Sequence, residues 1–368
     1  MLGLQGFTLF VIFLAITYSH LSPSNNLQLP NQASVGNQGC PNSTTISPCT
    51  CTDHGSYGLS MDCSEVQSEE RLKQIFQVQF PMNSFWTFSM VGNKDIKVLA
   101  EDIFGSATFE MFHITDGSLE TVEDGALTGS KDTAKFMYFL DNKNLTKFPF
   151  QNIHEFRILD SFYILSSNIS STSGLSSGSL TQLGLDYNPL ELPLPANLLD
   201  GLPELVRVSL AGVNLTQLTP GFISHNYHLE ELRLEHNNIN HLAADTFQSP
   251  SRSLRIISVA NNHIQDVEHQ AFPVVESLTI DLQHNALVYL NASIWRPLTE
   301  GHVMLRLGDN PLACDCDLAW LVLDPWNQKY TENGTCDGGV PISWLEPTPF
   351  ESCWDTQQPI ETTDIYLV

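Results

Sequence analysis

The chain has 368 residues, and its 16 Lys and Arg against 41 Asp and Glu give a formal net charge of −25. Phosphate recognition needs clustered cations that so acidic a chain lacks, so we expect no nucleic-acid partner. A hydrophobic fraction of 42% with 10% aromatic residues is typical of a folded protein and excludes a disordered acidic tail.

The N-terminal segment has the layout of a secretory signal peptide. Its apolar run FTLFVIFLAI, residues 7–16, is followed by small and polar residues and is short for a membrane span. A membrane anchor is the alternative, since the positive residues that usually precede such a run are missing. No second apolar stretch of membrane length follows, and the C-terminal residues lack the tail of a lipid-anchor signal. We therefore expect a secreted, extracellular protein without a membrane span in its mature chain.

The eight cysteines form two terminal groups of four, which indicates disulfide-bonded caps. They are Cys40, Cys49, Cys51, Cys63, Cys314, Cys316, Cys336 and Cys353. Zinc is the alternative, but an oxidising compartment and the C-x-C spacing favour disulfides. Six N-x-S/T sites agree with the secretory route, and we expect glycosylation at Asn42, Asn144, Asn168, Asn214, Asn291 and Asn333.

One phrase recurs between the cysteine groups. The runs from Leu229 to Leu242 and from Leu254 to Val267 both follow L-x-x-L-x-L-x-x-N-x-L. Counted by the Asn position or its equivalent, about ten units centre near residues 93, 117, 143, 167, 188, 213, 237, 262, 285 and 310. Alternate apolar residues fit a short parallel strand, and the Asn satisfies backbone groups where each coil turns.

A single coil cannot bury its apolar side, so the repeats must stack into a solenoid. The strands line its concave face, and irregular segments closed by Phe104, Phe247 and Phe272 form the convex side. The outermost coils would expose their core to water. The two cysteine groups lie where caps are needed.

These motifs resemble the extracellular leucine-rich-repeat family over nearly the whole mature chain. Residues 40–64 look like its N-terminal cap, and residues 310–321, NPLACDCDLAWL, look like its C-terminal cap. The resemblance implies an α/β solenoid (horseshoe) with a parallel concave sheet, a mostly irregular convex side and disulfide caps at both ends. It also implies pairing of first with third and second with fourth cysteines in each cap, although the long Cys40–Cys49 gap departs from the family pattern.

The expected organisation has six parts. They are a signal peptide (1–19), a disordered segment (20–39), an N-terminal cap (40–80), the repeats (81–312), a C-terminal cap (313–354) and a tail (355–368).

A closer resemblance lies in residues 61–99, MDCSEVQSEERLKQIFQVQFPMNSFWTFSMVGNKDIKVL. This segment is similar to crustacean secreted proteins related to the non-catalytic leucine-rich-repeat subunit of the shrimp Oplophorus luciferase. In that family the repeat subunit does not oxidise luciferin. The resemblance implies an accessory role beside a small catalytic partner, and no enzymatic activity of this chain.

Motifs for catalysis, metals or cofactors are weak. The G-x-S-x-G of residues 174–178 lies in a Ser- and Gly-rich loop instead of between a strand and a helix, so we do not expect a nucleophile there. His236 and His284 both precede the Asn of their repeats; we interpret them as solvated loop residues, with metal binding or pH sensing as the alternative. We expect no metal and no cofactor.

The concave face should carry the binding site. Once the leucines point inward, the residues between them must point outward, and an exposed apolar and aromatic surface usually marks an interface. This pattern predicts partner contacts at Met111, His113, Met137, Phe139, Tyr163, Leu165, Arg207 and Arg233. The N-terminal part of the face is apolar and aromatic, with Met111, Met137, Phe139, Tyr163 and Leu165, and the two arginines lie in the polar C-terminal part.

Two strand registers are ambiguous, over residues 85–91 and 136–141. Because FMYFL is apolar throughout, a one-residue insertion would turn Phe136, Tyr138 and Leu140 outward in place of Met137 and Phe139. Either register predicts an apolar patch. The alternative is that a cap or the Ser-rich insert covers it.

These observations together favour a secreted, non-catalytic protein-binding scaffold. We expect an accessory subunit of a luciferase-like complex that binds a protein, such as a small secreted catalytic subunit, on its concave face. The alternative is a soluble recognition or adhesion protein of innate immunity or the extracellular matrix.

Overall fold

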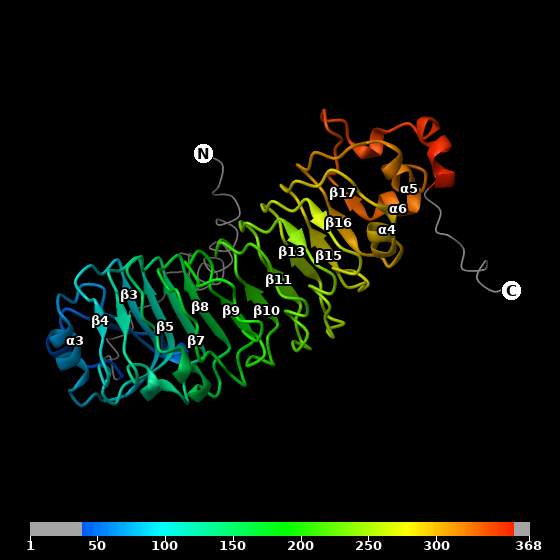
Figure 1. Cartoon of the computed structure of the whole chain (residues 1–368). Helices are drawn as coiled ribbons and strands as arrows, with labels where there is room; N and C mark the ends of the chain where they lie inside the picture. The colour runs from blue at the N-terminus through cyan, green and yellow to red at the C-terminus, as the bar shows by residue number, and fades with distance from the viewer. Residues whose placement is uncertain (1–38, 357–368) are drawn as a thin grey trace, which may run out of the picture. The chain divides into compact units, whose positions relative to one another are not determined.

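The computed structural model describes residues 39–356. The expected signal peptide, nearly all of the segment 20–39 and most of the C-terminal tail lie outside the described residues. Stacked coils each contribute one strand to a 13-stranded sheet (Figure 1). No helix of the described part is long and apolar enough to cross a membrane.

The predicted parallel leucine-rich-repeat sheet is confirmed. Its central strands are β3 (Ser84–Val91), β5 (Thr108–Thr115), β7 (Phe136–Leu140), β8 (Ser161–Leu165), β9 (Gln182–Gly184), β10 (Arg207–Ser209), β11 (Glu231–Arg233), β13 (Ile256–Ser258), β15 (Thr279–Asp281) and β16 (Met304–Arg306). At one end the sheet continues into an antiparallel hairpin, β1 (Thr50–Asp53) and β2 (Leu59–Asp62), and at the other into β17 (Thr331–Glu332). Two short parallel pairs join neighbouring coils away from this sheet: β4 (Val98–Leu99) with β6 (Thr121–Val122), and β12 (His241–Leu242) with β14 (Asp266–Val267).

Helices are short and concentrate in the caps. They are α2 (Ser43–Ile46), α3 (Glu69–Phe76), α4 (Ala292–Glu300), α5 (Ala319–Val322) and α6 (Pro325–Lys329). Segments of 3-10 helix are η1 (Gly55–Tyr57), η2 (Thr128–Ser130), η3 (Phe150–Glu155), η4 (Cys316–Leu318), η5 (Ile342–Trp344) and η6 (Thr348–Thr356). Phe104, Phe247 and Phe272, which were expected to close the convex segments, are buried.

The N-terminal end of the core is packed with phenylalanine. Helix α3 begins at its N-cap Ser68, whose hydroxyl accepts a hydrogen bond from the Arg71 amide at 3.2 Å, and it buries Phe76 against the first coils. The ring of Phe109 lies within 5.2–5.9 Å of five other phenylalanine rings. Aromatic packing of this density adds to the apolar surface removed from water.

A ladder of buried asparagines closes the turns after the strands. Asn237 donates to the carbonyls of Leu210 and Leu234, both at 2.9 Å, and accepts from the amides of Val213 and Leu215, both at 3.0 Å. A side-chain amide is suited to this position because it both donates and accepts. The other members are Asn93, Asn142, Asn188, Asn262, Asn285 and Asn310.

Each cap contains two disulfides. The structure joins Cys40 to Cys51, Cys49 to Cys63, Cys314 to Cys336, and Cys316 to Cys353, the pairs that the family resemblance implies. In the C-terminal cap, the buried Trp320 donates from Nε1 to the Leu290 carbonyl at 2.8 Å. These links close the exposed ends of the solenoid.

Candidate protein-binding face of the sheet

The outer face of the sheet presents its side chains in rows that run across the strands. The strand registers place one row through Ser89, His113, Tyr138, Tyr163, Gly184, Ser209, Arg233, Ser258, Asp281 and Arg306. Except at β7, where Tyr138 replaces Phe139, these are the outward positions that the repeat pattern predicts. The row on its amino-terminal side includes Met111, Phe136 and Arg207.

The prediction was wrong for Met137 and Phe139. Both point into the core and are 0% exposed, whereas Phe136, Tyr138 and Leu140 are half-buried on the outer face. The ladder asparagine of this coil is Asn142, which donates to the Leu140 carbonyl at 3.1 Å. The coil therefore has one residue more after its Asn than the repeat count assumed, and a one-residue shift exchanges the two faces of a strand.

Tyr163 and Leu165 point outward as predicted, but they are covered. Tyr163 is 7% exposed and Leu165 is 9% exposed. The next strand has Gly184 at the facing position, and a Cβ atom there would lie 2.4 Å from Cδ1 of Tyr163. The tyrosine ring occupies the space that this glycine leaves, and its hydroxyl donates to Oε1 of Gln182 at 3.0 Å.

The part that remains accessible is called the apolar patch below. It consists of the half-buried side chains of Met111, His113, Phe136, Tyr138 and Leu140. The rings of Phe136 and Tyr138 are stacked with centroids 6.4 Å apart, and Tyr138 lies 5.6 Å from the Tyr163 ring. Burial raises the pKa of Tyr138 to about 12 and lowers the pKa of His113 below its usual value. Both groups are therefore neutral near pH 7, which suits contact with an apolar surface.

A charged half of the face follows from β9 onward. Its outward residues are Asp186, Arg207, Glu231, Arg233, Glu235, Asp281, Arg306 and Glu332. Glu231 lies 3.4 Å from Nε of Arg207 and also contacts Arg233, which reaches Glu235 at 3.3 Å. Arg306 bridges Asp281 at 3.6 Å and Glu332 at 3.1 Å. The predicted binding residues Arg207 and Arg233 thus belong to a network of ion pairs.

Asp186 lies where the two halves meet and was not predicted as a site residue. Its Oδ1 accepts a hydrogen bond from the Ala211 amide at 2.9 Å. Burial raises the pKa of this carboxyl to about 6, against the opposing effects of the Ser209 hydroxyl and the Ala211 amide. Asp186 lies two residues after the outward Gly184, just as Leu165 follows Tyr163 and Glu235 follows Arg233. The same alternation therefore predicts that its side chain points outward.

We predict that Asp186 makes stability depend on pH. Because its pKa is raised, the native protein keeps a proton that the unfolded chain loses, so this contribution is present below about pH 4 and is lost as pH rises through about 6. Asp186→Asn keeps the acceptor for Ala211 and removes the titration. Urea unfolding measures the free energy of unfolding. Relative to the wild type, this free energy should rise by about 1–3 kcal/mol in the variant between pH 4 and pH 7. If the difference in unfolding free energy between the variant and the wild type is the same at pH 4 and pH 7, the prediction is contradicted.

Gly184 provides a second test of this region. Gly184→Ala places a methyl group against the Tyr163 ring, so we expect a loss of about 1–3 kcal/mol in the free energy of unfolding. The ring should also become reactive toward tyrosine nitration. Gly178→Ala is the matched control, because a Cβ there meets nothing within 4 Å. Equal effects of the two substitutions would show that Tyr163 does not depend on the glycine.

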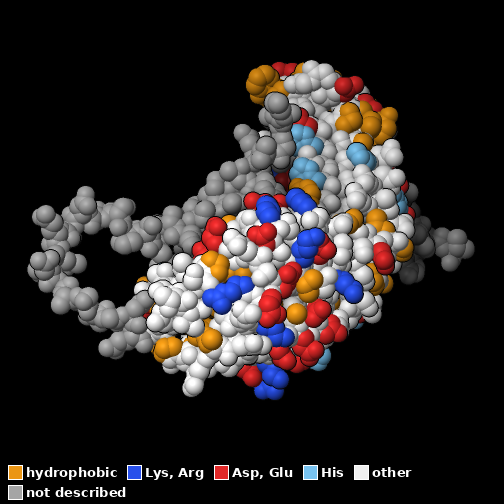
Figure 2. All heavy atoms as spheres, turned by 90° about the vertical axis from the view of Figure 1, so that its left-hand side faces the viewer, with side chains coloured by type: hydrophobic (Ala, Val, Ile, Leu, Met, Phe, Trp, Pro, Cys, Tyr) orange, Lys and Arg blue, Asp and Glu red, His pale blue; other side chains and the backbone are white. Residues whose placement is uncertain are grey.

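The face nearest the N-terminal cap carries charges of both signs. Figure 2 shows Lys and Arg side chains interspersed with Asp and Glu there, without a continuous field of one sign. At the surface, Nδ1 of His241 lies 2.8 Å from Asp266 and Nδ1 of His284 lies 3.3 Å from Asp309. Within residues 39–356, no group of three His, Cys, Asp or Glu side chains is arranged to hold a metal ion.

The six predicted glycosylation asparagines are all exposed, but their occupancy stays a prediction. They lie in the two caps and in the segments that follow the strands.

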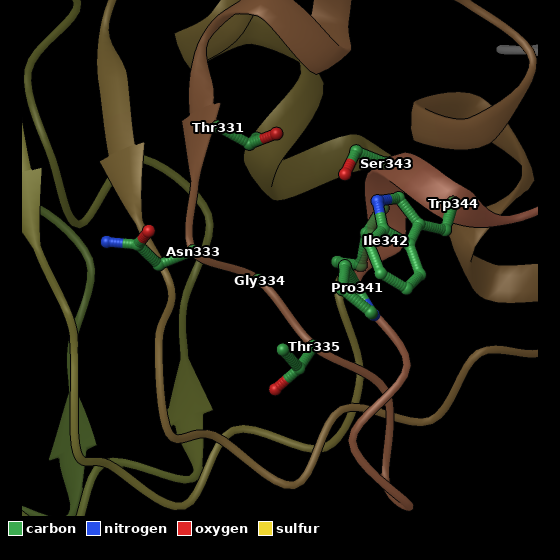
Figure 3. A pocket seen from close by; sticks show the side chains of 8 residues that line it. All are labelled: Thr331, Asn333, Gly334, Thr335, Pro341, Ile342, Ser343 and Trp344. Atoms are coloured by element: carbon green, nitrogen blue, oxygen red, sulfur yellow. The ribbon is translucent and has the colours of Figure 1, made fainter.

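A cavity of about 400 Å³ lies in the C-terminal cap beside β17 (Figure 3). None of the residues of the apolar patch lines it. It is lined by Thr331, Asn333, Gly334, Thr335, Pro341, Ile342, Ser343 and Trp344. None of these side chains is acidic, basic or a histidine, so the cavity offers no proton donor or acceptor of the usual catalytic kind. Residues 174–178, with the G-x-S-x-G motif, lie between β8 and β9 with no helix following the serine.

Comparison with known proteins agrees with the architecture. A family model described as leucine rich repeat matches residues 203–251. With the parallel sheet, the asparagine ladder and the capped ends, this match identifies the fold class. The chain has the leucine-rich-repeat fold.

Over most of its length, the chain is similar to a subunit of an enzyme. The Oplophorus-luciferin 2-monooxygenase non-catalytic subunit of Oplophorus gracilirostris is 29% identical over 319 residues, which cover 85% of this chain and 88% of that protein.

Two solved structures share the fold. A chain of the octameric complex of Latrophilin 3, Unc5D and FLRT2 matches with a TM-score of 0.61 and 19% identity, over 77% of this chain and 87% of that chain. The TLR13–ssRNA13 complex matches with a TM-score of 0.51 and 17% identity, over 72% of this chain and 40% of that chain. At these identities the two structures show the fold alone.

Proposed function

We propose that this chain is a secreted, non-catalytic accessory subunit that binds the small catalytic chain of a luciferase-like enzyme. The observation that carries the proposal is the similarity, over 85% of this chain, to a subunit named as non-catalytic. Four disulfides and six exposed N-x-S/T sites suit an oxidising, extracellular compartment.

The sheet face is large enough for such a partner. Ten strands at about 4.8 Å spacing, each with about three outward side chains, give roughly 700–800 Å², which is the area that one partner buries in a standard interface. The face also combines aromatic side chains with arginines, two residue classes that are enriched at interfaces. A scaffold of this kind contributes by binding and positioning its partner, and the chemistry belongs to the partner.

Affinity capture tests the proposal. The full chain is tagged, expressed in its source organism and recovered from secreted fluid, and the accompanying proteins are identified by mass spectrometry. We expect a small chain in stoichiometric amount, and an eluate that oxidises Oplophorus luciferin with light emission. Recovery of the tagged chain as a free monomer would contradict the proposal. Capture of a cell-surface or matrix protein would favour the alternative, a soluble recognition or adhesion protein.

A further inference from the structure

We infer that the partner contacts the junction between the apolar patch and the charged half, and that it presents an apolar side chain next to a Lys or Arg. The inference rests on the proposed function and specifies the surface and the chemistry of recognition. The junction lies over β7 to β10, with Tyr138 on its apolar side and Asp186 on its charged side.

The apolar side of the junction has a defined shape. The ring of Tyr163 fills the space above Gly184, and its centroid lies 5.6 Å from that of the Tyr138 ring. Tyr138 and Phe136 are half-buried beside the Tyr163 ring, and their own rings are stacked. Rigid aromatic rings lose little conformational entropy on binding, so a partner's apolar side chain can pack on them at low cost.

The charged side of the junction has an excess of carboxylates. The charged half contains five acidic residues, Asp186, Glu231, Glu235, Asp281 and Glu332, against three arginines, Arg207, Arg233 and Arg306. Every one of these arginines already contacts carboxylates of the same set. The ion pairs therefore leave this half of the face with a formal negative charge.

Asp186 is the carboxylate best placed for a cation from outside. It forms no ion pair with a Lys, Arg or His side chain of the described residues, and its ordered contacts are to the Ala211 amide and the Ser209 hydroxyl. Arg233 also acts on this carboxylate, but Glu231 and Glu235 already contact that arginine, and burial still has the larger effect on Asp186. A partner's Lys or Arg would relieve the cost of burying the carboxylate. The net charge of −25 favours a basic partner surface over an acidic one.

Two variants and two matched controls test the inference. The probe is the small chain captured with the wild-type protein, identified and then produced separately. Tyr138→Lys puts a charge on the apolar side, and Asp186→Asn removes the carboxylate without changing its shape. The controls are Tyr227→Lys, at a tyrosine that is 63% exposed in the turn before β11, and Asp102→Asn, at an exposed turn. Circular dichroism and urea unfolding show that each variant is folded, and Tyr138→Ala replaces Tyr138→Lys if the latter is not.

Binding is measured by calorimetry at two salt concentrations. We expect Tyr138→Lys to raise the dissociation constant about 100-fold and Asp186→Asn to raise it about 10-fold. Both controls should stay within about 2-fold of wild type. Salt should weaken wild-type binding more than binding by Asp186→Asn, because the variant has lost one charge pair.

The outcomes separate the inference from the proposed function. If no small chain is captured, the proposed function fails and the inference fails with it. If the chain is captured and binds both junction variants as tightly as wild type, the proposed function stands and the inference is overturned. An unchanged salt dependence in Asp186→Asn would likewise overturn the role of the carboxylate.

Discussion

Replacing Phe109 with alanine is expected to lower the free energy of unfolding by about 3–5 kcal/mol, because the truncation removes a ring that is 0% exposed and surrounded by other rings. The neighbouring aromatic side chains are Phe76, Phe85, Phe88, Phe104 and Phe112. They come from helix α3, from two strands and from the convex turn between them, so they cannot all move into the cavity. Urea unfolding followed by far-UV circular dichroism measures the loss.

The matched control for this substitution is Phe136→Ala. Phe136 is the same residue type on the next strand of the sheet, but it is half-buried on the outer face. We expect a loss of about 1 kcal/mol or less, because the surrounding water fills the space that the ring leaves. Similar losses for both variants would mean that the phenylalanine cluster does not anchor the N-terminal end of the core.

Asn237→Ala should lower the free energy of unfolding by about 2–4 kcal/mol. Its side chain hydrogen-bonds to groups of two neighbouring coils, the carbonyls of Leu210 and Leu234 and the amides of Val213 and Leu215. Alanine leaves these groups buried without partners, and an unsatisfied buried group costs about 1–3 kcal/mol. The penalties are not additive, because the coil can relax locally.

Asn238→Ala is the control for the ladder. Asn238 is the adjacent residue and is exposed, so its loss should change stability by about 0.5 kcal/mol or less. Hydrogen exchange adds a local measurement, since Asn237→Ala should accelerate exchange of the Val213 and Leu215 amides. Unchanged protection of these two amides would contradict the role of the ladder.

The repeat pattern identified the strands because the stacking of coils imposes one rule on every repeat. In β11, Leu232 is buried between the outward Glu231 and Arg233, as the alternation predicts. The disulfide pairing came from family resemblance, since cysteine spacing alone leaves three pairings open in each cap.

The face of β7 could not be predicted from its own residues. Phe136 to Leu140 are all apolar, so alternation gives no sign of which side chains enter the core. The position of Asn142 in the ladder decides the register, and this position depends on hydrogen bonds to the preceding coil. An apolar patch was predicted for either register, and the structure places it at Phe136, Tyr138 and Leu140.

The sequence by itself determined the leucine-rich-repeat class, the inward leucines and the location of the caps, because these follow from a local pattern repeated along the chain. Only the tertiary structure decided which outward side chains stay accessible and which carboxyl has a raised pKa. The ring of Tyr163 packs into the space that Gly184 leaves on the neighbouring strand, and burial by the surrounding coils raises the pKa of Asp186 to about 6. Both effects depend on side chains that are about 20 or more positions apart in the chain and become neighbours only when the coils stack.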